Sequence, residues 1–418
     1  MQKRFTLQLI AACALAMAGT AGFAQDVIKI ANIVELSGGG ATAAAAATIA
    51  PAAAQTVIGV SAPMTGPRAM LGRNFKNGVE LAVKEINASG GILGKKIQTN
   101  TADTQSNPGI AKGLTQKAID NDVFAIFGPV FSGSIMVSMA ESRRAEVPNF
   151  TGGEASSITQ QGNPYVFRTS FTQADAMPKV ARYISEQAKL KNIAIIYVNN
   201  DFGKGGNDAI KKALAATGTK VAAEISTEPG QVDFSAAVLR AKQSNADGLF
   251  AYSNEEESAR LLRELRKQGW NKPVIGETTL TGQKVIELAG EAANGAIAHV
   301  GLTVDAPQPA IRAFRAKFEK EYKYVSDHNG MKGYSGIYVL KAAIEKVGKL
   351  DRKAVAAALH TLKVKAADQP GVLMDVSFDS KGDLDRESFM IEVKNGKQEV
   401  VAILPPLGAA AAAPAAKK

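Results

Sequence analysis

The sequence predicts an α/β protein made of two lobes, each with a mostly parallel sheet flanked by helices. Short apolar segments alternate with amphipathic segments along most of the chain, which is the pattern of parallel strands connected through helices. The length of 418 residues exceeds that of a usual single domain. So many strands also favour two sheets over one very wide sheet.

The first alternating series opens at Val57 with a short apolar strand. Its helices have one apolar stripe each, and Asn107 followed by Pro108 is a typical start of a helix. The expected strands are 57–62, 97–102 and 123–127, and the expected helices are 73–88, 108–120 and 134–145.

A second series follows Thr169 and has the same alternation. Its expected helices are 175–188, 204–217, 234–243 and 255–268, and its strands are 192–198, 220–225, 247–251 and 273–276. Beyond Val304 two aromatic-striped helices follow, and a strand, turn and strand pattern closes the fold.

Residues 1–24 have the features of a cleaved secretory signal. Lys3 and Arg4 precede an apolar run, and 22–24 read small-x-small. The run is too short for a membrane anchor, and lipid attachment at Cys13 is the alternative. Cleavage removes the only cysteine, so no disulfide or Cys-ligated metal is expected.

The net charge of +10 does not indicate nucleic-acid binding. A nucleic-acid surface needs clustered basic residues with aromatics, whereas basic residues such as Arg260 and Arg263 are spread along helices. No cofactor is predicted. The Ala-rich tail, 406–418, is expected to be disordered.

Two segments compete for the first strand of the first sheet. Val57 to Ala62 leads directly into the turn and helix that follow, and we favour it. Residues 25–55 are then an extra N-terminal segment with an Ala-rich linker. The alternative takes Ile28 to Val34 as the strand and makes 41–72 a bulge.

The stretch from Thr56 to Asp103 carries a resemblance to a known family. VIGVSAP is followed by TGP, AVKEINASGGILGKK and TAD, which resembles the periplasmic solute-binding proteins of ABC transporters, branched-chain amino acid type. The likeness extends to Leu404. It implies a type I periplasmic-binding-protein fold with a three-segment hinge near 168–172, 299–304 and 374–379.

On this resemblance the lobes take two chain segments each. Lobe 1 is expected to contain 56–170 and 303–375. Lobe 2 is expected to contain 171–302 and 376–405.

The strongest candidate site follows the strand at 123–127. Ser132 and Ser134 open the next helix, where hydroxyls and backbone N–H groups can converge on a carboxylate. Plain capping of that helix is the alternative. In the relatives a serine here contacts the ligand carboxylate, which the resemblance assigns to Ser134.

A second candidate loop contains Gly152, Gly153 and Glu154. The resemblance implies that this loop contacts the main-chain groups of an amino acid. Glu154 stands where the relatives have threonine, so it either pairs with a ligand ammonium or faces solvent.

Three residues of the second lobe complete the prediction. Phe202 matches an aromatic that closes over the ligand in the relatives, and packing on its own lobe is the alternative. Asn254 has capping-box spacing to Glu257 but also matches a cleft position. Glu277 matches the acidic ligand of the α-ammonium.

No catalytic set is present in the sequence. His299, His328 and His360 are far apart, and no nucleophile elbow accompanies them. We therefore predict a monomeric periplasmic binding protein, not an enzyme, that delivers a small carboxylate-bearing solute to an inner-membrane ABC permease. An amino acid is the expected solute. A protein for an aromatic acid or amide and a sensory ligand-binding subunit are the alternatives.

Overall fold

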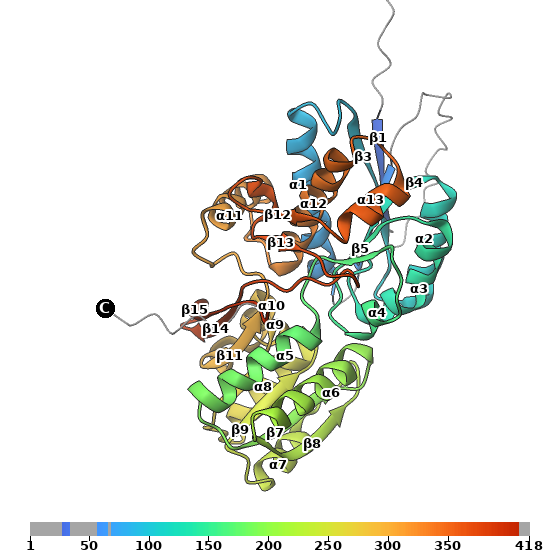
Figure 1. The fold of residues 1–418 in the computed structure, drawn as a ribbon. Helices are drawn as coiled ribbons and strands as arrows, with labels where there is room; N and C mark the ends of the chain where they lie inside the picture. The colour runs from blue at the N-terminus through green and yellow to red at the C-terminus, as the bar shows by residue number, and fades with distance from the viewer. Residues whose placement is uncertain (1–26, 34–56, 66–67, 409–418) are drawn as a thin grey trace, which may run out of the picture.

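The computed structural model describes residues 57–65 and 68–408, and the backbone of a strand at 27–33. Two lobes lie one above the other, each built on its own sheet (Figure 1). The predicted signal segment, the Ala-rich linker and the end of the tail lie outside the described residues.

The sheet of lobe 1 is parallel throughout. Its order is β1-β3-β2-β4-β5-β6. The strands are β1 (Val27–Ile33), β2 (Val57–Ala62), β3 (Lys96–Asp103), β4 (Val123–Phe127), β5 (Asn149–Thr151) and β6 (Val166–Arg168).

Both candidates for the first strand join this sheet. β2 is fully buried and leads into the first helix, as predicted for Val57 to Ala62. β1 pairs in parallel with both β2 and β3. The backbone of 27–33 is therefore part of the lobe 1 sheet and not a separate addition to it.

Helices cover the two faces of the lobe 1 sheet (Figure 1). α1 (Ala69–Ala88) and α12 (His328–Val347) pack together on one side, and α2 (Pro108–Asp120) and α3 (Ser132–Ala145) pack together on the other. The predicted cap of α2 is confirmed, because the Asn107 side chain accepts from two N–H groups of its first turn. The remaining helices are α4 (Ser157–Gln160), α11 (Pro309–Tyr322) and α13 (Arg352–Leu359).

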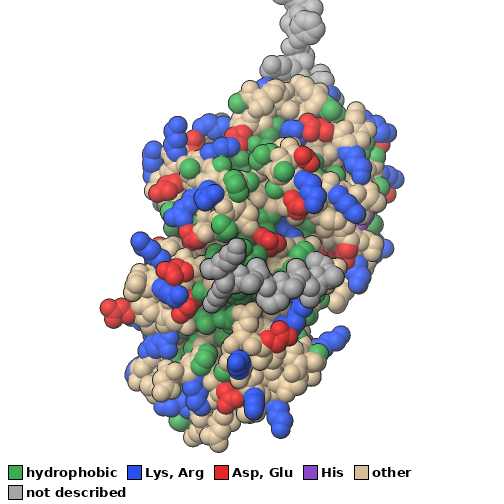
Figure 2. All heavy atoms as spheres, turned by 60° about the vertical axis from the view of Figure 1, so that its left-hand side comes forward, with side chains coloured by type: hydrophobic (Ala, Val, Ile, Leu, Met, Phe, Trp, Pro, Cys, Tyr) green, Lys and Arg blue, Asp and Glu red, His purple; other side chains and the backbone are tan. Residues whose placement is uncertain are grey.

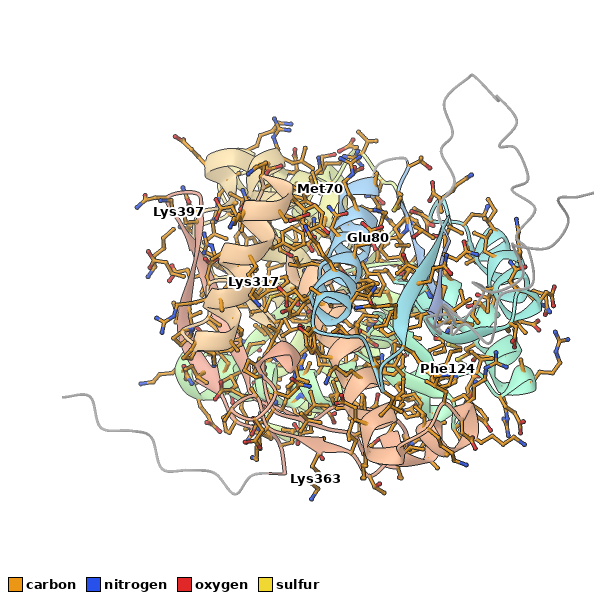
Figure 3. All side chains as sticks on the ribbon, turned by 90° about the horizontal axis from the view of Figure 1, so that it is seen from above. Met70, Glu80, Phe124, Lys317, Lys363 and Lys397 are labelled. Atoms are coloured by element: carbon orange, nitrogen blue, oxygen red, sulfur yellow. The ribbon has the colours of Figure 1, made fainter. Side chains whose placement is uncertain are left out.

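α11 also belongs to lobe 1, although it comes late in the chain. Figure 3 shows Lys317 on α11 beside α1, which carries Glu80. The Lys317 ammonium donates to Glu85 of α1 at 3.2 Å. The chain therefore returns to lobe 1 after building lobe 2, as the resemblance implied.

The sheet of lobe 2 is mixed, with the order β15-β14-β11-β10-β9-β7-β8. The strands are β7 (Asn192–Val198), β8 (Lys220–Thr227), β9 (Gly248–Tyr252), β10 (Val274–Glu277), β11 (Ala296–Val300), β14 (Ser388–Lys394) and β15 (Lys397–Leu404). β14 is antiparallel to β11 and forms a hairpin with β15. The predicted closing pattern, in which 372–379 and 389–403 are the two strands about a turn at Gly382 and Asp383, is wrong, because 389–403 itself contains both strands of the hairpin.

Helices pack on this sheet as two groups. α5 (Gln173–Arg182) packs on α6 (Asp201–Ala216), while α8 (Glu255–Lys267) packs between α7 (Ser235–Gln243) and α10 (Gln283–Ala289). The short α9 (Thr278–Thr281) follows β10 directly. None of the helices in the described part of the chain is long and apolar enough to cross a membrane.

The third crossing between the lobes lies later than predicted. β13 (Val376–Ser377) pairs with β12 (Lys363–Val364) in a two-stranded sheet of its own, and Asp383 binds Arg168 of β6. Residues 376–383 therefore remain with lobe 1. We place the crossing between Asp383 and Ser388 instead of at 374–379.

Basic side chains do not gather into one patch on the face seen in Figure 2, where Lys and Arg are interspersed with acidic residues over both lobes. Many take part in ion pairs at the surface, such as Lys84 with Glu321. On this face the distribution agrees with the predicted solvated helix surfaces.

Candidate ligand-binding site

A cavity of about 470 Å³ lies between the two lobes, at the carboxyl ends of several strands. This is where open α/β sheets bind their ligands. Lobe 1 contributes the starts of α3 and α12 and the 152–154 loop, and lobe 2 contributes the starts of α6 and α8.

The cavity brings together nearly all of the predicted site residues. Its lining includes Ser132, Ser134, Gly152, Gly153, Glu154, Phe202 and Asn254. Glu277 does not line the cavity, but Thr279, two residues further on, does.

A larger hollow of about 880 Å³ lies elsewhere on lobe 1. Its lining includes Lys95 and Asp122, which immediately precede β3 and β4, so it is at the amino ends of strands. Because ligands of such sheets bind at the carboxyl ends, the cavity between the lobes is the candidate site.

The end of β4 requires glycine at position 128. Gly128 has φ +100°, and a Cβ there would lie 1.9 Å from the carbonyl oxygen of Ser61 on β2. This close passage lets the chain turn directly into α3, so that the first turn of α3 faces the cavity.

Ser132 and Ser134 differ in what they bind. Ser132 Oγ accepts from the N–H groups of Glu154 and Ala155, at 3.4 and 3.3 Å, so it shapes the neighbouring loop instead of capping α3. Ser134 makes no side-chain hydrogen bond to another described residue, although it is buried against the cavity. Its hydroxyl and the N–H groups of the first turn of α3 are suited to an anion.

Glu154 has a partner within the chain. Its Oε1 accepts from the Lys332 ammonium and the Ser170 hydroxyl, both at 3.0 Å. Lys332 also donates to the carbonyl of Gly152 at 3.2 Å. Glu154 therefore does not face solvent as a loop charge, because both members of the ion pair are about 95 % buried.

Lys332 reaches this position because α12 lies unusually close to α1. A Cβ on Gly78 of α1 would lie 1.9 Å from the Gly330 carbonyl oxygen, and one on Gly333 would lie 2.3 Å from the Phe75 carbonyl oxygen. The Asp327 side chain caps α12, accepting from the N–H groups of Asn329 and Gly330. Burial raises the pKa of Asp327 to about 6.

Arg168 holds the 152–156 loop from behind. Its guanidinium, which is fully buried, donates to the carbonyls of Gly153 and Ala155, and its Nε donates to Asp383 at 2.6 Å. The loop backbone is thereby fixed to β6 and to the segment that precedes the third crossing.

The wall from lobe 2 contains an aromatic ring and acidic residues. Phe202 lines the cavity and also packs on Tyr252 at 4.4 Å, so both of its predicted roles are compatible. The Asn254 amide donates to Glu257 at 3.3 Å and makes no side-chain cap of α8. Glu255 lines the cavity, and burial raises its pKa to about 7.

Glu277 lies at the end of β10 and is fully buried. Neither carboxylate oxygen makes a hydrogen bond of normal geometry, although Thr278 lies close enough to lower its pKa in part. Burial, and then the nearby charge of Glu154, raise the pKa of Glu277 well above its usual value. An uncompensated carboxylate of this kind is suited to a cation.

Several cavity residues were not predicted as site residues. The main ones are Arg68, His328, Asn329 and Lys332. Lys332 had a readable signal, because it is the one charged residue between Asn329 and Leu340 of α12. Arg68 gave none, since it precedes α1 in a polar turn.

The described residues contain no group of three or more His, Cys, Asp or Glu side chains suited to a metal.

Two sheets, three crossings and a cavity between the lobes define a two-lobe solute-binding protein. A family model described as "Periplasmic binding protein" matches residues 55–398. The chain therefore belongs to the periplasmic solute-binding proteins of ABC transporters, in the branched-chain amino acid-binding family.

Curated relatives agree over most of their length. The chain is 31% identical to "Leu/Ile/Val-binding protein BraC3" of Rhizobium johnstonii over 357 residues, which is 84% of this chain and 95% of the relative. It is 26% identical to the "Leucine-, isoleucine-, valine-, threonine-, and alanine-binding protein" of Pseudomonas aeruginosa, covering 81% and 90%. The fold and these relatives are those of solute-binding proteins, not of enzymes.

Solved structures share the fold. A leucine binding protein, LivK, from Thermotoga maritima has a TM-score of 0.77 at 24% identity, covering 83% of this chain and 98% of that one. A solute binding protein of an ABC transporter from R. palustris, in complex with benzoate, has a TM-score of 0.75 at 24% identity, covering 83% and 95%.

Proposed function

We propose that this protein is a periplasmic binding component of an ABC importer and that its solute is a small α-amino acid. The observation that supports the amino acid is the opposite polarity of the two cavity walls. Ser134 and the first turn of α3 offer neutral donors to a carboxylate. On the side of lobe 2, Glu277, which is buried two residues before Thr279 of the cavity lining, offers a carboxylate without an ion-pair partner among the described residues.

The charge balance around the cavity favours a solute with a positive group. Lys332 is paired with Glu154, and Arg68 lies 3.8 Å from Glu257. Glu255 and Glu277 make no ion pair with a described side chain, although Arg68 and Lys332 lie near enough to offset part of the rise in their respective pKa values. A ligand ammonium would compensate this excess of negative charge.

An aromatic acid is the second candidate, because solute binding proteins of the same fold are found with benzoate. A benzoate carries no cation, so it would leave Glu277 buried without a partner. The cavity polarity therefore supports the amino acid over the aromatic acid.

The proposed mechanism is closure around the solute. Lobe 1 would hold the carboxylate at Ser134 and at the Gly152 and Gly153 backbone, and lobe 2 would bring Phe202 over the solute. Contact with the Glu277 carboxyl, which lies outside the present cavity lining, would form as the lobes close on the solute. The permease would then accept the closed form, so that binding and docking share one equilibrium.

The test is calorimetric titration of protein that has been unfolded and refolded to remove carried-over ligand. L-Leucine, L-isoleucine, L-valine, L-glutamine and benzoate are the probes. We expect at least one amino acid to bind more tightly than benzoate. Binding of benzoate alone would refute the amino-acid proposal.

The Glu277→Gln variant tests the polarity argument directly. Removing one partner of a buried charge pair should weaken the best amino acid by at least about thirtyfold. The same amino acid without its ammonium, offered as the simple carboxylic acid, should bind the wild type and the variant alike. Equal losses of affinity for both ligands would show that Glu277 does not bind the ammonium.

A further inference from the structure

The buried pair of Glu154 and Lys332 in the lobe 1 wall is incompletely hydrogen-bonded. Glu154 Oε2 has no partner among the described residues, although it is shielded from solvent. The Lys332 ammonium carries three N–H groups, and the described residues supply two acceptors for them, Gly152 O and Glu154 Oε1. One acceptor and one donor, side by side, therefore remain unused.

Both residues line the cavity, so a solute bound there can supply the missing partners. Buried polar groups are nearly always hydrogen-bonded in native proteins. An ion pair without full hydrogen bonding is weak evidence for a stabilising role, because removing two charges from water is costly. The pair is therefore better explained by recognition than by stability of the fold.

The chemistry of the pair selects among solute groups. A second ammonium would be repelled by Lys332, and a second carboxylate by Glu154. An alkyl group would leave Glu154 Oε2 and the spare Lys332 N–H without partners. A carboxamide satisfies both, because its NH₂ donates to Glu154 while its carbonyl oxygen accepts from Lys332.

We propose that Glu154 and Lys332 form the side-chain recognition element of the site and that the solute is an α-amino acid with a carboxamide side chain. This inference rests on the proposed function, which assigns the two charged ends of the solute to Ser134 and Glu277. It deepens that proposal because it assigns the side chain of the solute, in addition to its two charged ends.

The test is titration of the refolded wild-type protein with L-glutamine, L-asparagine, L-leucine, L-threonine and benzoate. The better of the two amides should bind at least about tenfold more tightly than leucine, because a site with buried polar groups rejects an analogue that cannot pair with them. Leucine as the tighter ligand would overturn this inference and leave the amino-acid proposal standing. Benzoate as the only ligand would overturn both.

Threonine tests the identity of the side-chain group. The threonine hydroxyl also donates and accepts hydrogen bonds, but both from a single atom. Threonine should therefore bind more weakly than the better amide. Threonine as the tightest ligand would overturn the carboxamide assignment.

A double variant, Glu154→Gln with Lys332→Met, removes both charges together and avoids leaving one of them buried alone. We expect the preference for the amide over leucine to fall to within about threefold, with leucine binding retained. The matched control is Lys84→Met with Glu321→Gln, an exposed ion pair on lobe 1. An unchanged preference in the folded double variant would refute the role of the pair. If the double variant does not fold, the ligand panel on the wild type still decides.

Discussion

The two walls of the cavity differ in how completely they are assembled before a solute arrives. In the lobe 1 wall, Arg168 holds the 152–156 loop and Ser132 accepts from two of its N–H groups. On the side of lobe 2, Glu255 in the cavity wall and Glu277 beside it are buried without an ion pair to a described side chain. The comparison indicates that lobe 1 is preorganised to receive the solute, whereas lobe 2 needs the solute to become electrostatically satisfied.

Breaking the preorganised wall should have the largest effect. Arg168→Met leaves Asp383 and the carbonyls of Gly153 and Ala155 without their buried donor. We expect the free energy of unfolding to fall by about 3–5 kcal/mol, the usual cost of removing one partner from a buried ion pair. Urea denaturation measures the loss, and calorimetry of any folded variant should show weakened solute binding.

The exposed Arg182 provides the control, since its replacement by Met should change stability by no more than about 0.5 kcal/mol. Adding Asp383→Asn to Arg168→Met should restore part of the lost stability, because no unpaired charge then remains. An Arg168→Met variant as stable as the wild type would show that the lobe 1 wall is not held by this residue.

The preorganised wall was also the easier one to predict. Ser132, Ser134 and the two loop glycines lie in local patterns, at the ends of strands and the start of a helix, which a sequence displays directly. Their partner Lys332 lies 178 residues from Glu154 and reaches it only because α1 and α12 meet through glycines. Such a long-range pairing leaves no local pattern in the sequence. Glu154 was therefore predicted as a site residue, but its partner Lys332 was not.

The fold was predicted in the same uneven way. Strands buried on both faces, such as β2 and β4, are continuous apolar runs and were assigned correctly. β13 was mistaken for part of the lobe 2 sheet, because an apolar run such as 372–378 does not reveal which strand it will pair with. The choice between β1 and β2 had no answer in local sequence, since both pair in one sheet.

The buried carboxyl of Glu255 in the lobe 2 wall should make the stability of the protein depend on pH. Burial raises the pKa of Glu255 to about 7 in the folded protein, from a usual value of 4.5. The folded state then binds more protons than the unfolded state between these two pH values, so the free energy of unfolding falls as pH rises from about 4.5 to about 7. Glu255 should contribute at most about 3 kcal/mol to this fall.

Unfolding by urea at pH 5 and pH 8, without solute, measures this loss. Glu255→Gln should make the difference between the two pH values smaller, and Asp327, whose pKa is raised to about 6, should account for part of the remainder. Glu256→Gln, at the neighbouring and more exposed position, is the control. An identical pH dependence in the wild type and the Glu255 variant would contradict the assignment.

The smallest effect is expected where the two walls touch. Arg68 of lobe 1 lines the cavity, lies 3.8 Å from Glu257 of lobe 2 and sits over the ring of Phe131, so this ion pair joins the two lobes beside the cavity. Arg68 is about a quarter exposed, and pairs of that kind contribute roughly 0.2–1 kcal/mol. Arg68→Gln should therefore weaken solute binding by no more than about fivefold. Calorimetry at low and high salt separates the causes, because screening should reduce wild-type affinity more than that of the variant. A loss far beyond tenfold would place Arg68 in direct contact with the solute, as a second cation of the lobe 1 wall besides Lys332.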